Sequence, residues 1–432
     1  MAAPLKQITP DQVASFAYDP VDPRALADAR VIVDDVRERG LEALKAHAAR
    51  LGDIADAEQP VLVSKDELRA AFLKLPANEQ QVLQRTTQRI RVFAQSQRAS
   101  IGNFEQKIDG GFAGQDVSAM SAAGCYAPGG RYPLPSSVLM TAVTARVAGV
   151  KTVVVASPRP ALATLAAAYL AEADYFIAVG GAQSIAAMAY GVGGIPACDI
   201  IVGPGNKWVT AAKSLVFGKC AIDMLAGPSE CLVIADETAN VDTIAADLLA
   251  QAEHDTAAVP ILITTSQSVI DGVNKSIETQ LTTLPTYVEV AVADLTAFNA
   301  ETNRSLQGFA VLCPDMDTCV AMSDVLAPEH LEVITKNAEE VAKQVKNFGG
   351  LFIGGRAAEV FGDYGAGPNH VLPTGGTAKY TGGLSVHTFL RIRTWMRIDD
   401  AEASQSLVQD SALLARMEGL EGHARAAEQR LL

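Results

Sequence analysis

The stretch KTVVVAS at residues 151–157 decides the fold, because it opens a series of short apolar runs that alternate with helical segments. The next members of the series are YFIAV (175–179), DIIV (199–202) and CLVIAD (231–236). Runs of this length, apolar throughout and rich in Val and Ile, are typical of strands buried on both faces of a parallel sheet. Their alternation with helices is the βαβ pattern, so we predict an α/β protein.

A second series of the same kind follows, and its members are PILITT (260–265), YVEVAV (287–292), GFAVLC (308–313) and LEVIT (331–335). Helical segments are expected from about residue 240 and over residues 338–347. Upstream, residues 24–99 are predicted to be helical. Ser64, with Glu67 three residues later, is a capping-box pattern that begins one of these helices.

The composition limits the kinds of partner. The chain has 432 residues, of which 49% are hydrophobic and 19% charged, which is ample for about two or three folded domains. Its net charge is −14. A protein that binds a phosphate backbone needs a basic face, so we expect no nucleic-acid partner and a small-molecule substrate instead.

Membrane insertion and secretion are not expected. Residues 175–198 carry no charge, but their Gly-Gly pairs divide them into a strand, a short helix and a turn, which favours a buried core over a membrane span. The N-terminal stretch MAAPLKQITPDQ lacks the basic segment and apolar run of a signal peptide. The 6 cysteines have no CxxC spacing and are typical of reduced thiols, so we expect a cytoplasmic protein.

Three loops rich in Gly and Pro lie at the ends of predicted strands: Tyr126–Gly130 (YAPGG), Gly203–Asn206 (GPGN) and Gly227–Glu230 (GPSE). In open α/β sheets, ligands bind beyond the carboxyl ends of strands, where glycine lets the backbone approach a phosphate or a ring. Any one of these loops is equally consistent with a tight turn. Three of them together favour a nucleotide or cofactor site, although no GxGxxG, P-loop, GxSxG or HExxH motif accompanies them.

Two pairs of side chains could carry chemistry. Gln251 and His254 lie three residues apart in a predicted helix and therefore on one face, where an amide oxygen beside an imidazole could hold a metal ion. An ordinary helix surface explains this pair more simply. Glu329 and His330 follow Pro328 and could share proton transfer near neutral pH, or form an ordinary exposed pair.

The remaining histidines are ambiguous from the residues alone. Asp363 and His370 flank the glycine-rich loop GAGPN, which indicates either a site or a turn that the aspartate stabilises. Glu418 and His423 lie in the tail, where a solvated helix end is the simpler interpretation. His47 and His387 have no evident partner and are interpreted as structural.

Seven ordered blocks resemble the histidinol dehydrogenase family, which is zinc- and NAD-dependent. The blocks are Tyr126–Gly130, Ala178–Ala187, Ile201–Asn206, Ile222–Asp236, Asp247–Asp255, Ala327–Glu332 and Gly362–Thr374, and the tail from Glu418 to His423 also matches. The resemblance spans nearly the whole chain, and seven blocks in order are far more specific than any single motif.

The resemblance implies a role for each matching residue. The implied zinc ligands are Gln251, His254, Asp363 and His423, and the implied NAD contacts are Tyr126, Gln183 and Asn206. Glu329 and His330 match the family's acid/base pair. Substrate contacts are implied for Ser229, His370 and Glu418, in addition to the zinc ligands and His330, and Glu359 matches a family carboxylate near the site.

The resemblance also implies an architecture of two incomplete Rossmann-like domains with small helical terminal domains exchanged in a homodimer. We accordingly predict an N-terminal arm (1–21), a discontinuous first domain (22–122 and 231–384), a second domain (123–230) and a C-terminal helical tail (385–432). So short a tail cannot hold its own core and must dock on something. In such a dimer, the tail would supply Glu418 and His423 to the partner subunit, so the active site would be shared.

The activity implied is the four-electron, NAD-dependent oxidation of L-histidinol to L-histidine through bound histidinal. The chain departs from the family pattern at Arg131–Leu134, at Pro368 and over residues 380–390. Similar features occur in related dehydrogenases that oxidise other small alcohols, such as sulfopropanediol dehydrogenase. Arg131 could recognise a sulfonate or carboxylate, so a sulfonated or carboxylated diol is the alternative substrate.

Overall fold

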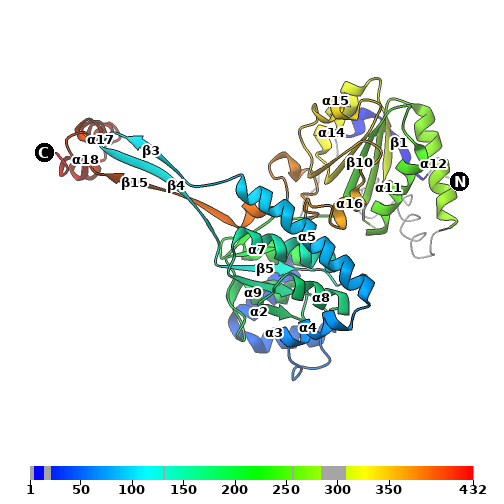
Figure 1. Ribbon diagram of the computed structural model, residues 1–432, viewed down its shortest axis with the longest axis horizontal. Coiled ribbons are helices and arrows are strands. Elements are labelled where there is room, and N and C mark those ends of the chain that lie inside the picture. The colour runs from blue at the N-terminus through cyan, green and yellow to red at the C-terminus, as the bar shows by residue number, and fades with distance from the viewer. Residues whose placement is uncertain (1–3, 14–20, 130–131, 255–256, 284–307, 432) are drawn as a thin grey trace.

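Two sheet-centred domains and a slender arm make up the chain (Figure 1). The computed structural model describes residues 4–13, 21–129, 132–254, 257–283 and 308–431. Each domain holds a 6-stranded sheet, and the arm holds a 3-stranded sheet with the C-terminal helices at its far end. The predicted α/β class is therefore confirmed.

Domain A is built on the sheet β1-β12-β11-β10-β13-β14, in which every pair is parallel. Its strands are β1 (Lys6–Ile8), β10 (Glu230–Ala235), β11 (Val259–Thr264), β12 (Phe309–Leu312), β13 (His330–Ile334) and β14 (Gly350–Ile353). Its helices are α1 (Pro10–Val13), α11 (Val241–His254), α12 (Gln267–Leu281), α14 (Met316–Leu326), α15 (Ala338–Ala342) and α16 (Glu359–Asp363). Cys231 and Val233 of β10 pack on α11 and α12, whereas Leu232 and Ile234 face α14 and α15, so both faces of the sheet are buried.

Domain B is built on the sheet β2-β7-β6-β5-β8-β9, which is parallel except for β2. Its strands are β2 (Leu62–Val63), β5 (Ala122–Tyr126), β6 (Thr152–Ala156), β7 (Tyr175–Ile177), β8 (Ile200–Val202) and β9 (Ala221–Ile222). Its helices are α2 (Pro23–Arg39), α3 (Leu41–Arg50), α4 (Lys65–Lys74), α5 (Ala77–Ala99), α6 (Pro135–Val138), α7 (Thr144–Ala148), α8 (Leu162–Leu170), α9 (Gly181–Tyr190) and α10 (Lys207–Val216). Between α6 and α7 the chain forms a π-helical turn, η1 (Leu139–Val143).

The two domains meet at opposite ends of their sheets. Tyr126 ends β5 and Gly203 follows β8, so domain B presents the carboxyl ends of these two adjacent strands. Ser229 precedes β10 and His330 begins β13, so domain A presents amino ends. Residues from both edges line one cavity. The order of the strands in domain B reverses between β5 and β8, which is where ligands bind in open α/β sheets.

The arm extends away from both domains (Figure 1). It contains β3 (Phe104–Ile108), β4 (Gly111–Ala119) and β15 (Leu390–Ile398), and at its tip α17 (Gln405–Met417) and α18 (Glu421–Glu428). Strand β15 pairs antiparallel with β4 along its whole length. Leu413 and Met417 are exposed at the tip, so the arm leaves apolar surface uncovered in the single chain.

The predicted domain boundaries are wrong in two places. Residues 22–99 were assigned to the same domain as residues 231–384, but α2 packs on α9 and α10, α4 packs on α8, and α5 packs on α7, all in domain B. The predicted N-terminal arm instead contributes β1 to the sheet of domain A. The apolar face of an amphipathic helix shows that the helix packs on something, but it does not identify the sheet. The sequence pattern alone therefore could not assign these helices to one of the two domains.

The predicted strands that lie within the described residues are confirmed, but several observed strands were not predicted, among them β1, β2, β3, β4 and β9. The tail predicted to be helical contains the nine-residue strand β15, which is exposed on both faces beyond Leu390 except at the half-buried Trp395. The short strand β14, inside the glycine-rich segment, was not predicted. The predicted strand at 287–292 lies outside the described residues. Among the helices that are described, none is both long and apolar enough to span a bilayer.

Candidate functional site

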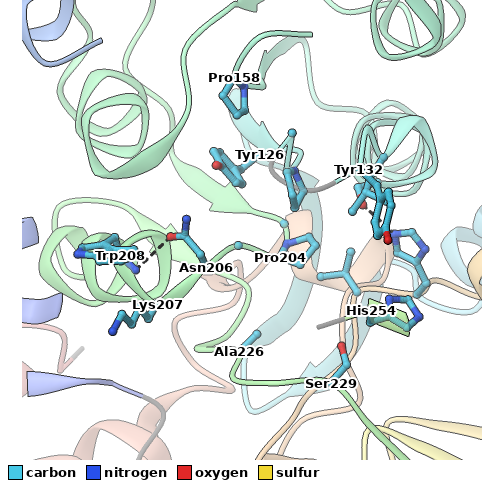
Figure 2. A pocket seen from close by; sticks show the side chains of 18 of the residues that line it. Tyr126, Tyr132, Pro158, Pro204, Asn206, Lys207, Trp208, Ala226, Ser229 and His254 are labelled. Atoms are coloured by element: carbon cyan, nitrogen blue, oxygen red, sulfur yellow. Dashed lines mark hydrogen bonds between the residues drawn. The ribbon is translucent and has the colours of Figure 1, made fainter. Parts of the chain in front are cut away.

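A cavity of about 2310 Å³ lies between domain A and domain B, and nearly all of the predicted site residues within the two domains line it. Those that do are Tyr126, Gln183, Asn206, Ser229, His254, Glu329, His330, Glu359, Asp363 and His370. Figure 2 shows its two ends, with Asn206, Lys207 and Trp208 on one side, His254 and Tyr132 on the other, and Pro204 between them. The cavity can therefore hold an extended ligand alongside a smaller one.

The domain B end is built from backbone loops. Gly203 has φ +115 and approaches Tyr126 so closely that a Cβ atom would overlap the Tyr126 carbonyl oxygen, so only glycine fits this turn. The Tyr126 hydroxyl accepts a hydrogen bond from the backbone N–H of Gly181 at 3.3 Å, at the start of α9. Asn206 caps α10 by accepting from the N–H groups of Trp208 (3.1 Å) and Val209 (3.2 Å). Glycine loops and helix N-termini at a switch point suit a nucleotide phosphate.

The domain A end holds a cluster of metal-ligating side chains. One ligand atom from each of His254, Glu359 and Asp363 lies within 4.8 Å of the others. Gln251, one turn earlier in α11, is fully buried, and neither its Oε1 nor its Nε2 has a hydrogen-bond partner within the described parts of the chain. Imidazole, carboxylate and an unsatisfied amide oxygen form a donor set that zinc accepts, so these residues fit the predicted metal.

Electrostatics at this end favour a cation. Burial would lower the pKa of His254, but hydrogen bonds to Asp363 and Glu359 outweigh it and raise the pKa to about 10. Burial would raise the pKa of Asp363, but the hydrogen bond from His254 and the imidazoles of His370 and His330 hold it below its usual value. The negative charge of Glu359 and Asp363 stabilises the protonated imidazole of His254, and the same charge would attract a metal ion bound between these side chains.

The predicted acid/base pair begins strand β13 and faces the cavity. His330 Nδ1 donates to the Glu230 carbonyl oxygen at 3.0 Å, so in the neutral ring Nε2 is the nitrogen that carries no hydrogen. This Nε2 is buried and has no hydrogen-bond partner among the described residues, yet His330 lines the cavity. Glu329 Oε2 accepts from the N–H of Glu230 at 3.0 Å and lies 3.7 Å from His330 Nδ1. The structure therefore brings the pair together at a fixed tautomer.

Burial and neighbouring charges raise the pKa of both groups of this pair. Burial raises the pKa of the Glu329 carboxyl to about 8. Burial would lower the pKa of His330, but Glu359, Glu329 and Asp363 together raise it to about 9. Groups with perturbed pKa values that meet in one cavity are candidates for general acid/base work.

His370 and Ser229 occupy different parts of the site. His370 Nδ1 donates to the Asp363 carbonyl oxygen at 3.0 Å, and its Nε2 accepts from the hydroxyl of Ser137 at 3.2 Å. Burial lowers the pKa of His370, which keeps the ring neutral in this arrangement. Ser229 lies at the floor of the cavity below His254 (Figure 2).

Three predicted site residues do not line the cavity of their own chain: Gln251, which is fully buried in α11, and Glu418 and His423 of the tail. Glu418 ends α17 and His423 lies in α18, at the tip of the arm, and both are exposed there. Figure 1 shows this tip far from the boundary between the two domains. Arg131, the residue that raised the alternative substrate, lies outside the described residues, whereas Pro368 is exposed in the loop before Asn369.

Several residues of the site were missed by sequence reasoning. Burial raises the pKa of Glu230 to about 7, and its backbone holds both Glu329 and His330. Lys213 and Asp223 form a buried ion pair that holds the backbone of Gly203. Lys213 Nζ donates to the Gly203 carbonyl oxygen at 3.0 Å, and the Asp223 carboxylate accepts from the Gly203 N–H at 2.7 Å. Lys213 lies on the apolar face of its helix, and a lysine in that position indicates a buried partner of opposite charge.

Comparisons with known proteins agree with this geometry. The family described as histidinol dehydrogenase matches residues 21–431. The histidinol dehydrogenases of Parasynechococcus marenigrum and Thermus thermophilus are 42% and 41% identical, covering 93% and 95% of this chain and 90% and 95% of their own. A sulfopropanediol 3-dehydrogenase of Ruegeria pomeroyi is 37% identical over 93% of this chain and 91% of its own.

A solved structure extends the comparison to three dimensions. A histidinol dehydrogenase from Elizabethkingia anophelis superposes with a TM-score of 0.90 at 29% identity, covering 100% of this chain and 98% of that one. The family match and the relatives above 40% identity span both domains and the arm. The chain therefore belongs to the histidinol dehydrogenase family.

Proposed function

We propose that this protein is a zinc-containing histidinol dehydrogenase, which oxidises L-histidinol to L-histidine through bound histidinal and reduces two NAD in doing so. The observation that carries the proposal is His330. Its Nδ1 is fixed by the Glu230 carbonyl, and its Nε2 makes no hydrogen bond among the described residues and lies 3.8 Å from Asp363 Oδ1. His330 lines the cavity that also contains the His254–Asp363 cluster and the glycine loops of domain B.

His330 acts first, as the base for the alcohol. Its Nε2 accepts the hydroxyl proton as the carbonyl forms, because Nδ1 already carries the other proton. The raised pKa of His330 comes partly from Asp363 and Glu359, so a cation held by those carboxylates brings the pKa back toward neutrality. Glu329, buried beside it, then holds the proton of the water that attacks the aldehyde.

The cofactors are assigned to the two ends of the cavity. When bound, zinc orients the substrate and offsets negative charge, and NAD accepts the hydride. Gln251, His254 and Asp363 would hold the metal from this chain, with Glu359 beside them. Tyr126, Gln183 and Asn206 would contact the dinucleotide, near the N-terminus of α9 and the Gly203 turn.

Charge around the metal ligands favours a cationic amino alcohol. Glu253, Glu329, Glu359 and Asp363 line the domain A end of the cavity, whereas the lysines that line it, Lys207 and Lys213, belong to α10 at the domain B end. The Ruegeria relative supports the second candidate, a sulfonated small diol, whose sulfonate group would need a cationic side chain beside it.

We further propose a homodimer in the cytoplasm, in which each arm completes the partner's site. Three observations support it: the apolar tip residues Leu413 and Met417 are exposed, His423 lies outside the cavity of its own chain, and the cluster of His254, Glu359 and Asp363 is exposed on one side at His254. The described cysteines are all free and buried, as in a reducing compartment.

The test is a substrate comparison. Purified enzyme with zinc and NAD should reduce NAD with L-histidinol and release L-histidine, and should be far slower with sulfopropanediol. Oxidation of sulfopropanediol with no turnover of histidinol would replace the first candidate by the second.

A further inference from the structure

The loop that carries the metal ligand Asp363 does not end in domain A but crosses to domain B. Gly365 has φ +91 and packs so closely on α5 that a Cβ atom would overlap Cγ2 of Thr86. Val371 belongs to the hydrophobic core of domain B. The loop from Asp363 to Val371 is thus a bridge between the domain that would hold the metal and the domain that would hold the dinucleotide.

Asn369 is the centre of this bridge. Its Nδ2 donates to the Met140 carbonyl oxygen at 2.8 Å and to Thr144 Oγ1 at 3.2 Å, and its Oδ1 accepts from the N–H of Val371 at 3.0 Å. Met140 lies in the π-helical turn η1, and both Met140 and Thr144 are buried. The amide therefore joins its own loop to the interior of domain B through three hydrogen bonds.

The Met140 carbonyl that accepts from Asn369 lies within the π-helical turn η1. In a continuous α-helix the N–H of Thr144 would donate to the Met140 carbonyl, but here it donates to the carbonyl of Thr141. The Met140 carbonyl accepts hydrogen bonds from two side chains, the Thr144 hydroxyl at 2.6 Å and the Asn369 amide at 2.8 Å. Single π-helical turns of this kind are frequent at functional sites.

A second link runs beside the first. His370 accepts from Ser137 of α6 and donates to the backbone carbonyl of Asp363. Ser137, Thr141 and Thr144 are buried polar residues that follow one another along the α6–η1–α7 segment. Asn369 and His370 therefore form their hydrogen bonds with the same segment of domain B. Two hydrogen bonds in series, through the His370 ring, therefore connect Asp363 to Ser137 of domain B.

From these contacts we infer that Asn369 is a positioning residue: by bonding to η1, it sets the register between Asp363 of domain A and the nucleotide loops of domain B. The inference rests on the proposed function, in which the substrate on one domain must meet the nicotinamide on the other. A two-step oxidation adds a reason for a fixed joint, because the aldehyde must stay in place while one dinucleotide leaves and another enters. A shift of about 1 Å between reacting groups can cost about 100-fold in rate.

The experiment compares Asn369→Ala and the near-isosteric Asn369→Asp with wild type. The matched control is Asn274→Ala, since Asn274 also accepts from a backbone N–H (Leu5, 2.8 Å) and donates to a carbonyl, but within domain A. Measurements are zinc content per chain, NAD affinity by calorimetry, kcat and KM, and the deuterium isotope effect with alcohol labelled at the carbinol carbon. The substrate in these measurements is the alcohol that the wild-type enzyme oxidises. If the wild type does not oxidise histidinol, the proposed function is refuted, but the role of Asn369 can still be tested with the alcohol that is oxidised.

The expected result is that both Asn369 variants keep zinc and bind NAD within about threefold of wild type, while kcat falls about 10- to 100-fold. The isotope effect should rise, because a longer hydride distance makes the chemical step slower, and the Asn274→Ala control should show neither change. A simple loss of folded protein lowers kcat without altering the isotope effect, and that pattern would overturn the inference. If neither variant folds, Thr144→Val, which removes one partner of the amide, should give a smaller change in the same direction; an unchanged kcat and isotope effect there would also overturn it.

Discussion

The Nε2 atom of His254, at the end of α11, lies 3.3 Å from the Oδ2 atom of Asp363, at the end of α16. Glu359 Oε1 lies 3.5 Å from the same nitrogen. The two helices belong to one domain, but four strands of its sheet lie between them in the sequence. Their ends are therefore brought together by the tertiary fold. A positive charge between them stabilises the cluster, and the proposed enzyme would supply it as zinc.

Removing either partner should therefore remove the metal. We expect His254→Ala and Asp363→Asn to weaken zinc binding by more than roughly 100-fold, since even outer-shell changes cost up to that amount. Zinc content after dialysis against a weak chelator measures this directly. The control is His387→Gln, an exposed histidine in the turn before β15, which should keep a full complement of zinc. Equal zinc in all three variants would remove His254 and Asp363 from the metal site.

Glu329 should control the pH dependence of the reaction. As a base it works as the carboxylate, and burial raises its pKa to about 8, so kcat/KM should rise as the pH increases through about 8. Glu329→Gln should lower turnover of the aldehyde about 100-fold or more and abolish this rise. A pH profile of histidinal oxidation in wild type and variant is the measurement. An unchanged profile in the variant would assign the rise to another group.

Glu329→Gln should lower activity but raise the stability of the folded protein at high pH. The folded protein retains the Glu329 proton between pH 4.5, the ordinary value, and about 8, whereas the unfolded chain releases it. The unfolded state binds fewer protons over this interval, so the contribution of Glu329 to folding stability falls as the pH rises. Glu329→Gln removes that dependence, and its Tm should exceed that of wild type at pH 8 more than at pH 5. A larger gain at pH 5 would contradict the assignment.

The buried pair Lys213–Asp223 should matter for both stability and the nucleotide. Lys213→Met leaves the Asp223 carboxylate buried without its cation, which should cost about 3–5 kcal/mol of unfolding free energy. It should also raise KM for NAD, because the Gly203 carbonyl loses its donor. The double variant with Asp223→Asn should recover part of the stability.

The matched control for this pair is Lys65→Met. Lys65 pairs with Asp174 at 3.0 Å but its side chain is 68% exposed, so its removal should cost less than about 1 kcal/mol and leave KM unchanged. Denaturant unfolding and NAD titration give both quantities. A comparable loss in the two lysine variants would show that burial of the Lys213 pair has no special effect.

Sharing of the site between subunits should be visible in mixed dimers. His423→Ala and His330→Ala enzymes should each be nearly inactive, but a dimer of one with the other contains one intact site if each arm reaches the partner. Random mixing should then restore about a quarter of wild-type activity. The measurement is activity after refolding an equal mixture, with the fraction of hybrid dimers checked by affinity tags. Verified hybrids with no activity would place His423 in its own chain's site or in none.

The sequence predicted the parts of this site that depend on local pattern. The strand runs around Val153–Val155 and Leu232–Ile234 identify buried parallel strands, and the Gly203 loop was assigned correctly to a strand end. Gln251 and His254 were placed on one helix face because helical spacing is local. These features need no knowledge of what lies across the fold.

The rest depended on tertiary contacts that no local pattern records. The sequence did not indicate that α2–α5 cover domain B, since an apolar helix face fits either sheet. Nor did it indicate that Asn369 reaches Met140, because the two residues are far apart in the chain and their hydrogen bond depends on the tertiary fold. The roles of Glu418 and His423 came from family resemblance alone, as the single chain leaves both exposed.

The most direct test of the central claim is the ratio of NADH formed to alcohol consumed. With limiting L-histidinol, excess NAD and zinc-loaded enzyme, we expect two NADH for each histidinol, L-histidine as the product and no free aldehyde. Formation of one NADH with release of the aldehyde, or no NADH from histidinol while sulfopropanediol is oxidised, would contradict it.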